Sequence, residues 1–115
     1  MTSKKLSEFL AKLMLEKKGE EIVILDLRKL TPVTDFFVIC TGSSELHIRA
    51  ISDYILEESK KKDEKAWHNE GYKNLNWVLI DFVDVVVHIF RNEARNFYKL
   101  ETLWGDAKIS KVIDK

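Results

Sequence analysis

Residues 41–47, Thr-Gly-Ser-Ser-Glu-Leu-His, have side chains and a position that could serve a phosphate or a nucleophilic serine. They follow an apolar run and precede a helical pattern, and backbone N–H groups at such junctions bind phosphate. A phosphate loop needs further glycines or a following lysine, but this stretch has only Gly42 and no lysine. We therefore predict that a serine hydroxyl caps the next helix, which contributes about 1 kcal/mol.

The same stretch raises an enzymatic alternative. Gly42, Ser43 and Asp53 imitate the Gly-Ser and Asp-x-Asp elements of nucleotidyltransferases. Those enzymes hold Mg²⁺ between two carboxylates that lie two residues apart on a strand. Here Asp53 is followed by Tyr54 and Ile55 in a helical pattern, so we expect no catalytic metal site. A nucleotide-binding or nucleotidyl-transferring domain that uses Gly42, Ser43 and Asp53 stays open as the alternative.

Histidine and cysteine show no local pattern of a metal site. His47, His68 and His88 share no close spacing, and Cys40 is the single cysteine. Cys40 lies inside an apolar run, which favours an inert buried thiol. One cysteine cannot form a disulfide within the chain, as is usual in a reducing compartment, so we expect a cytoplasmic protein without metal or cofactor.

Composition limits the partners. The 115 residues match the size of one domain, so a single domain over residues 1–115 is expected. Nineteen basic residues balance nineteen acidic ones, which removes the overall field that would attract nucleic acid or an anionic membrane. No segment approaches the roughly 20 apolar residues of a membrane span. Lysines 60–62 and Lys65 leave an RNA-binding alternative, although such lysines are usually the solvated end of a helix.

Apolar periodicity predicts the elements that position these residues. Apolar stripes at helical spacing predict three helices. The first runs from Leu6 to Gly19, the second covers residues 45–62, and the third runs from a cap at Asn92 to Gly105. Strands are predicted at residues 22–27, which should be covered on both faces, at 36–41 and at 66–68. Residues 76–90 predict a hairpin. This order predicts an α/β fold with a single mixed β-sheet flanked by helices.

The predicted hairpin has two different faces. With Phe82 and Val83 as a two-residue loop, Asp81 stands opposite Asp84, and polar residues flanking a turn are ordinary rather than a cation site. One face is purely aliphatic and should be core; it carries Val78, Ile80, Val85, Val87 and Ile89. The other face should be partly exposed; it carries Trp77 opposite His88, Leu79 opposite Val86, and the two aspartates.

Aromatic side chains are the strongest candidates for binding. Trp77, Tyr98 and Trp104 are large and amphipathic, and such residues dominate binding energy where they meet a partner. Trp104 lies on a helical stripe, which favours a place in the core. For Trp77 and Tyr98 both the core and the partner surface stay open.

Three segments together resemble the ribosomal silencing factor family, also called RsfS or Iojap. They are "DFFVICTGSSELHIRAISD" at 35–53, "WVLIDFVDVVVHIF" at 77–90 and "RNFYKLETLW" at 95–104, and the resemblance extends from about residue 6 to 107. It implies a nucleotidyltransferase-like α/β fold without catalytic carboxylates, and a role that is not enzymatic. It further implies binding to the fourteenth protein of the large ribosomal subunit, on the face that meets the small subunit. Subunit joining would then be blocked sterically and translation repressed when nutrients are short.

The resemblance also places residues at the partner surface. By position in the motifs these are Trp77 and Tyr98, with Asp81, Asp84, His88, Arg95 and Glu101 nearby. The chain departs from the family's "DxGD" at the hairpin tip, where Val83 replaces glycine. A β-branched residue tolerates positive φ poorly, so a different loop with a shifted register must be allowed. Members of this family are often dimers, which makes a homodimer a further expectation.

Overall fold

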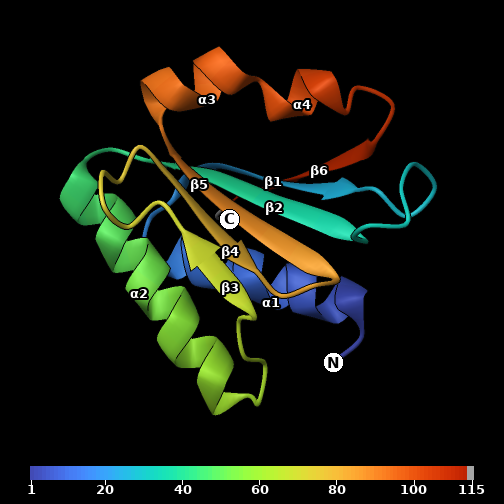
Figure 1. Cartoon of the computed structure of the whole chain (residues 1–115), viewed down its shortest axis with the longest axis horizontal. Helices are drawn as coiled ribbons and strands as arrows, with labels where there is room; N and C mark the ends of the chain where they lie inside the picture. The colour runs from blue at the N-terminus through green and yellow to red at the C-terminus, as the bar shows by residue number, and fades with distance from the viewer. Residues whose placement is uncertain (114–115) are drawn as a thin grey trace.

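The computed structural model describes residues 1–113, in which six strands form one mixed sheet with helices on both faces (Figure 1). The strand order across the sheet is β3-β4-β5-β2-β1-β6. β2 and β5 are parallel, and the other neighbours are antiparallel. The strands are β1 (Glu20–Asp26), β2 (Phe36–Gly42), β3 (His68–Glu70), β4 (Trp77–Asp81), β5 (Val85–Arg91) and β6 (Lys108–Val112). The predicted α/β fold is thus confirmed, whereas the likeness to nucleotidyltransferases stays a prediction.

Two long helices cover one face of the sheet, α1 (Ser3–Glu16) and α2 (Glu45–Lys61). The Thr2 hydroxyl accepts from the Lys5 N–H at the start of α1, as a cap does. The end of α1 differs from the prediction, because Lys18, with φ of 60°, takes the left-handed conformation that was expected of Gly19.

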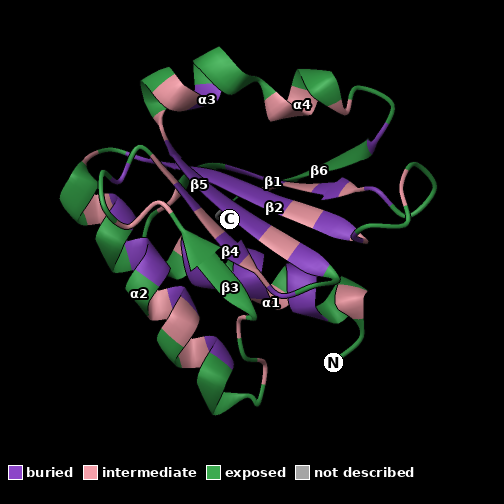
Figure 2. Cartoon of the chain, in the orientation of Figure 1, coloured by how far each residue is buried: buried purple, intermediate pink, exposed green. Residues whose placement is uncertain are grey.

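The face under α1 and α2 holds the larger core (Figure 2). Every second residue of β4 and β5 points into it, so the aliphatic face predicted for the hairpin is confirmed as buried. Helical residues fill it from outside, chiefly Leu10 and Met14 of α1 and Ile51 and Ile55 of α2. Leu46, expected on the apolar stripe of α2, is instead 78% exposed.

A smaller core lies on the opposite face, under α3 (Asn92–Tyr98) and α4 (Leu100–Leu103). Its buried residues are Val23, Leu25, Leu27, Ile39, Phe90 and Ala107. Val23 and Leu25 come from β1, and Ile22 of the same strand points to the other face and belongs to the larger core. The expectation that this strand is covered on both faces is therefore confirmed.

The hairpin between β4 and β5 has a different register from the predicted one. Asp81 pairs with Val86 instead of Asp84, and Trp77 pairs with Phe90 instead of His88. The loop is centred one residue later than predicted. Moving the centre of the loop by one residue shifts the strand pairing by two residues. Because side chains alternate between the faces with a period of two, each stays on its predicted face of the sheet.

The C-terminal region departs most from the sequence prediction. The single helix expected from Asn92 to Gly105 is broken at Lys99, which has a φ of 49°, and Arg91 occupies the cap position without a side-chain hydrogen bond. β6 was not predicted; it pairs with β1 at one edge of the sheet. β3 forms the other edge and begins at His68, two residues after the predicted start.

Candidate functional site

An aromatic cluster forms where the start of β4 meets the end of α3. The Trp77 ring stacks on Phe90 with centroids 4.9 Å apart, and the Tyr98 ring lies 4.6 Å from Trp77. Tyr98 is 50% exposed, whereas Phe90 is buried in the smaller core. The cluster thus extends from the core to the surface through Trp77, which packs against the smaller core while staying partly exposed. A place for Trp77 at a partner surface stays a prediction.

His88 supports this cluster from inside. It lies on β5 diagonally across from Trp77, and the Trp77 indole Nε1–H donates to the His88 Nδ1 at 3.0 Å. The imidazole is 3% exposed, and desolvation by this burial lowers the pKa of His88 to about 3. His88 is therefore neutral at physiological pH and does not itself face a partner.

A shallow groove of about 320 Å³ lies beside the cluster. Its walls come from the edge strand β3, the turn that follows it, β4 and the end of α3; they are Glu70, Gly71, Asn74, Asn76, Trp77, Leu79 and Tyr98. Gly71 is required there, because its φ is 95° and a Cβ would meet the Trp77 carbonyl oxygen at 1.9 Å. The groove thus joins apolar side chains to amide and carboxylate groups that could accept or donate hydrogen bonds.

Arg95 and Glu101 form a separate pair that fastens the two short helices to the sheet. The Arg95 guanidinium donates to both Glu101 carboxylate oxygens, from Nε at 3.1 Å and from Nη2 at 3.0 Å. Its Nη1 donates to the Glu21 carbonyl at 2.7 Å and to the Thr41 hydroxyl at 2.9 Å. Since Arg95 is only 7% exposed, it orients α3 and α4 and leaves Glu101, which is one third exposed, nearer the surface.

Asp81 and Asp84 lie at the hairpin tip, at the far end of β4 from Trp77. The Asp81 carboxylate accepts from the Val83 N–H at 2.7 Å and so stabilises the turn. Asp81 is four residue steps along β4 from Trp77, about 13 Å at the usual rise per residue. The structure therefore brings Trp77, His88 and Tyr98 together, keeps Arg95 with Glu101, and leaves the two aspartates apart.

Several exposed apolar side chains were not singled out from the sequence as surface residues. Phe97 is 79% and Leu103 72% exposed, although both were expected on a buried stripe, and Phe97 lies 5.1 Å from Tyr98. Trp67 is 75% exposed just before the edge strand β3. Trp104 packs edge-on against Phe37 at 6.1 Å and belongs to the rim of the smaller core, as predicted. Lys99 interrupts the predicted helix between Phe97 and Leu103, and no sequence signal marked this break.

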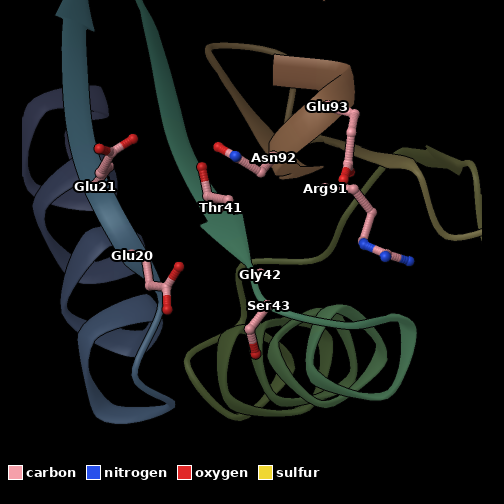
Figure 3. A pocket seen from close by; sticks show the side chains of 8 residues that line it. All are labelled: Glu20, Glu21, Thr41, Gly42, Ser43, Arg91, Asn92 and Glu93. Atoms are coloured by element: carbon pink, nitrogen blue, oxygen red, sulfur yellow. The ribbon is translucent and has the colours of Figure 1, made fainter. Parts of the chain in front are cut away.

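The Gly42-Ser43 junction opens onto a pocket of about 440 Å³ between β1, β2 and the start of α3. Figure 3 shows the two glutamates of β1 on one side of the opening and Arg91 on the other. Glu20, Glu21 and Glu93 supply three carboxylates against the single guanidinium of Arg91. Such a lining repels an anionic phosphate instead of attracting it.

Three of the backbone donors at this junction are already used within the chain. The Ser43 N–H donates to the His47 Nδ1 at 2.9 Å, and the His47 N–H donates to the Ser44 hydroxyl at 3.0 Å. The Ile48 N–H bonds the Ser44 carbonyl. Ser44 is therefore the cap of α2, which confirms the capping interpretation, and these N–H groups are not free for a phosphate.

Asp53 is remote from that pocket. It lies eight residues into α2, accepts a hydrogen bond from the Tyr72 hydroxyl at 3.0 Å, and does not line the opening. Among residues 1–113, no group of three or more His, Cys, Asp or Glu side chains could hold a metal ion. Cys40 is fully buried, and burial raises its pKa to about 12. No helix in the described part of the chain has the length and apolarity to cross a membrane.

Sequence comparisons relate the whole chain to one protein family. A family model described as "Ribosomal silencing factor during starvation" matches residues 1–115. The ribosomal silencing factor of Halalkalibacterium halodurans is 37% identical over 107 residues, 93% of this chain and 92% of that one. The one of Haemophilus influenzae is 36% identical over 100 residues, 87% and 98% of the two chains. Chloroplastic Iojap of Zea mays is 41% identical over 98 residues, 85% of this chain and 42% of its own length.

Solved structures share the arrangement of helices and strands. A crystal structure of a Chromobacterium violaceum protein superposes with a TM-score of 0.89 at 30% identity, covering 99% of this chain and 95% of that one. A second, from Bacillus halodurans, has a TM-score of 0.81 at 33% identity and covers 96% and 99%. The sheet order and both helical layers are thus common to experimentally determined relatives.

Proposed function

This chain belongs to the ribosomal silencing factor family, and from that premise we propose that it represses translation by holding the two ribosomal subunits apart. The partner is the large subunit, contacted through its fourteenth protein on the face that meets the small subunit. The docking surface, as we define it, consists of Trp77 and Tyr98 with the groove beside them. Asp81, Asp84 and Glu101 lie further out, and His88 and Arg95 act from the interior.

The observation that carries this proposal is the aromatic pair at the surface. Trp77 and Tyr98 lie 4.6 Å apart beside a groove of about 320 Å³ with polar walls. Both rings are already held by packing, so binding would cost little conformational entropy. Aromatic residues fixed in this way at the edge of a groove are typical centres of protein interfaces.

The mechanism requires only size and position. The chain measures 35 × 33 × 31 Å over its described residues. A rigid body of that thickness, docked on a surface that the small subunit must touch, keeps the subunits from closing on each other. No bond is made or broken, which agrees with a pocket at Gly42 whose lining repels phosphate and beside which the Ser43 and His47 N–H groups are already hydrogen-bonded.

The decisive experiment truncates both aromatic side chains of the docking surface. We expect the double variant Trp77→Ala/Tyr98→Ala to lose at least about 100-fold in affinity for purified large subunits, since interface centres typically contribute 2 kcal/mol or more each. The measurement is cosedimentation with large subunits, followed by subunit joining when small subunits are added. Wild-type protein should leave the subunits separate, and the double variant should let them join.

The matched control is Leu46→Ala, which truncates a side chain that is 78% exposed on α2, across the sheet from the docking surface. This control should cosediment like the wild type. Trp77 also packs on Phe90, so circular dichroism and melting must show that the double variant is folded. If it is unfolded, Tyr98→Ala alone decides, because Tyr98 is half exposed. A folded variant that still binds and still separates the subunits would refute this surface.

A further inference from the structure

His88 is a polar side chain in a place where an apolar one would be expected. It occupies the middle of β5, is 3% exposed, and is surrounded by rings: Phe37 from β2 at 4.4 Å, Trp77 from β4 at 5.8 Å and Phe90 at 6.1 Å. Its β-sheet neighbours on either side are Ile39 and Leu79. No charged group faces the imidazole from these neighbours, so it does not serve an ion pair.

The hydrogen bond to Trp77 determines which imidazole nitrogen carries the hydrogen. An indole Nε1–H can only donate, so the His88 Nδ1 at 3.0 Å must accept, and the hydrogen of the neutral ring lies on Nε2. That Nε2 has no hydrogen-bond partner among the described residues. His88 thus supplies an acceptor to Trp77 and leaves its own buried Nε2–H unpaired. An unpaired buried donor lowers stability, so packing alone would favour an apolar side chain at this position.

We propose that His88 is a positioning residue for the docking surface: its Nδ1 fixes the Trp77 indole in the orientation that lines the groove beside Tyr98. Stacking on Phe90 fixes the plane of the indole but leaves it free to slide or turn within that plane, whereas a hydrogen bond at one edge fixes its in-plane orientation. Without the acceptor, the indole N–H would be unpaired in a half-buried site, and the ring would turn toward water to satisfy it. This role rests on the proposed function, because it concerns the same surface.

Two substitutions separate the acceptor from the packing. His88→Phe keeps a ring of similar shape, removes the acceptor and removes the unpaired N–H. His88→Asn loses most of the ring but keeps an oxygen where Nδ1 stood. If His88 serves packing alone, His88→Phe should be more stable than His88→Asn and should also bind more tightly. A positioning role predicts opposite rankings: the Phe variant is the more stable, and the Asn variant binds more tightly.

The first measurement needs no ribosome. In ¹⁵N-labelled full-length protein, the Trp77 indole N–H resonance is identified by its disappearance in Trp77→Phe. In the wild type and in His88→Asn this resonance should be protected from exchange with water. In His88→Phe we expect protection to fall at least about tenfold. If the resonance keeps its protection in the Phe variant, the hydrogen bond does not orient the indole and the proposal is overturned.

The second measurement is the dissociation constant for purified large subunits, with Trp77→Ala and Leu46→Ala as the two references. We expect His88→Phe to bind about tenfold more weakly than the wild type and His88→Asn to bind within about threefold of it. Should the larger ring prevent folding, His88→Leu takes its place as the acceptor-free variant.

The possible failures are distinguishable. If Trp77→Ala loses binding while His88→Phe keeps it, the proposed function stands and the role of His88 is overturned. Equal weakening in the Phe and Asn variants would also overturn it, because the acceptor would then make no difference. If Trp77→Ala binds like the wild type, the docking surface itself is wrong, and the positioning role is overturned with it.

Discussion

At the scale of single residues, the buried imidazole of His88 links stability to pH. Burial lowers its pKa to about 3, against an ordinary value of 6.5, because the protonated ring would lose its hydration. In the unfolded chain the ring takes up a proton as the pH falls below 6.5, and in the folded chain it does not. The stability that depends on the neutral ring is therefore complete above pH 6.5 and is lost as the pH falls toward 3.

We predict that protonation of His88 in the unfolded chain lowers the free energy of unfolding by about 2 kcal/mol when the pH falls from 7 to 5. Urea denaturation at both pH values measures it in the wild type and in His88→Phe, whose curve should be flatter by that amount. His68→Gln is the control, because it removes an exposed histidine from the edge strand β3. A Phe variant with the same pH dependence as the wild type would show that the ring is protonated in the folded protein.

The sequence indicated which residue types form the candidate site, but it did not indicate how far each side chain is buried. Trp77 and Tyr98 stood out because large amphipathic side chains dominate binding energy where they meet a partner, and the structure brings the two together. His88 and Arg95 carry polar groups that usually face water, yet both are buried. Their burial depends on partners distant in sequence, such as Thr41, 54 residues from Arg95, and no local pattern announces such contacts.

At the scale of elements, the β4–β5 hairpin shows how much a strong pattern can fix. Alternation placed each side chain of both strands on the correct face, while the loop residues and the pairing were wrong. Val83 takes a φ of 75°, and the Asp84 N–H bonds the Phe82 carbonyl at 3.0 Å, which gives a tight turn of three residues. The sequence pointed to an atypical loop, since valine stands where the resemblance to the family leads one to expect glycine, but could not specify its geometry.

We predict that Val83→Gly raises the free energy of unfolding by about 0.5–1 kcal/mol. Left-handed backbone costs a residue with a Cβ about 1–2 kcal/mol, which exceeds the entropy that glycine adds to the unfolded chain. Val83 is 55% exposed, so little buried area is lost. Val33→Gly is the matched control at an 80% exposed valine without positive φ, and it should lower stability. If both variants are destabilised alike in urea denaturation, the turn at Val83 is not strained.

The C-terminal elements were less predictable for two physical reasons. Apolar residues at helical spacing indicated one helix, but the left-handed Lys99 divides it, and the preference of a lysine for that conformation is too weak to read from sequence. β6 carries mostly exposed side chains, so it lacks the apolar run that reveals a buried strand. Its place is fixed by pairing with β1, a contact between segments about 85 residues apart in the chain.

At the scale of the whole molecule, balanced charge separates a protein partner from RNA. Nineteen basic and nineteen acidic residues leave no net charge, and the lysines at the end of α2 are balanced locally as well. Residues 57–65 contain four lysines and four acidic residues, and Lys61 pairs with Glu58 at 2.7 Å. An RNA-binding surface would instead present lysines without such neighbours, since its affinity comes from displaced counterions.

We therefore predict that binding to large subunits depends weakly on salt. Four lysines on phosphates would give a slope near −3 in log affinity against log salt, or roughly a 30-fold loss for a threefold rise in salt. An interface centred on Trp77 and Tyr98 should lose less than about threefold over the same range, because apolar contact is not screened. Cosedimentation at fixed magnesium and increasing potassium measures the slope, with a Lys60→Gln/Lys62→Gln/Lys65→Gln variant as comparison. A steep slope that flattens in this variant would mean that the end of α2 binds ribosomal RNA and that the aromatic surface is not the main contact.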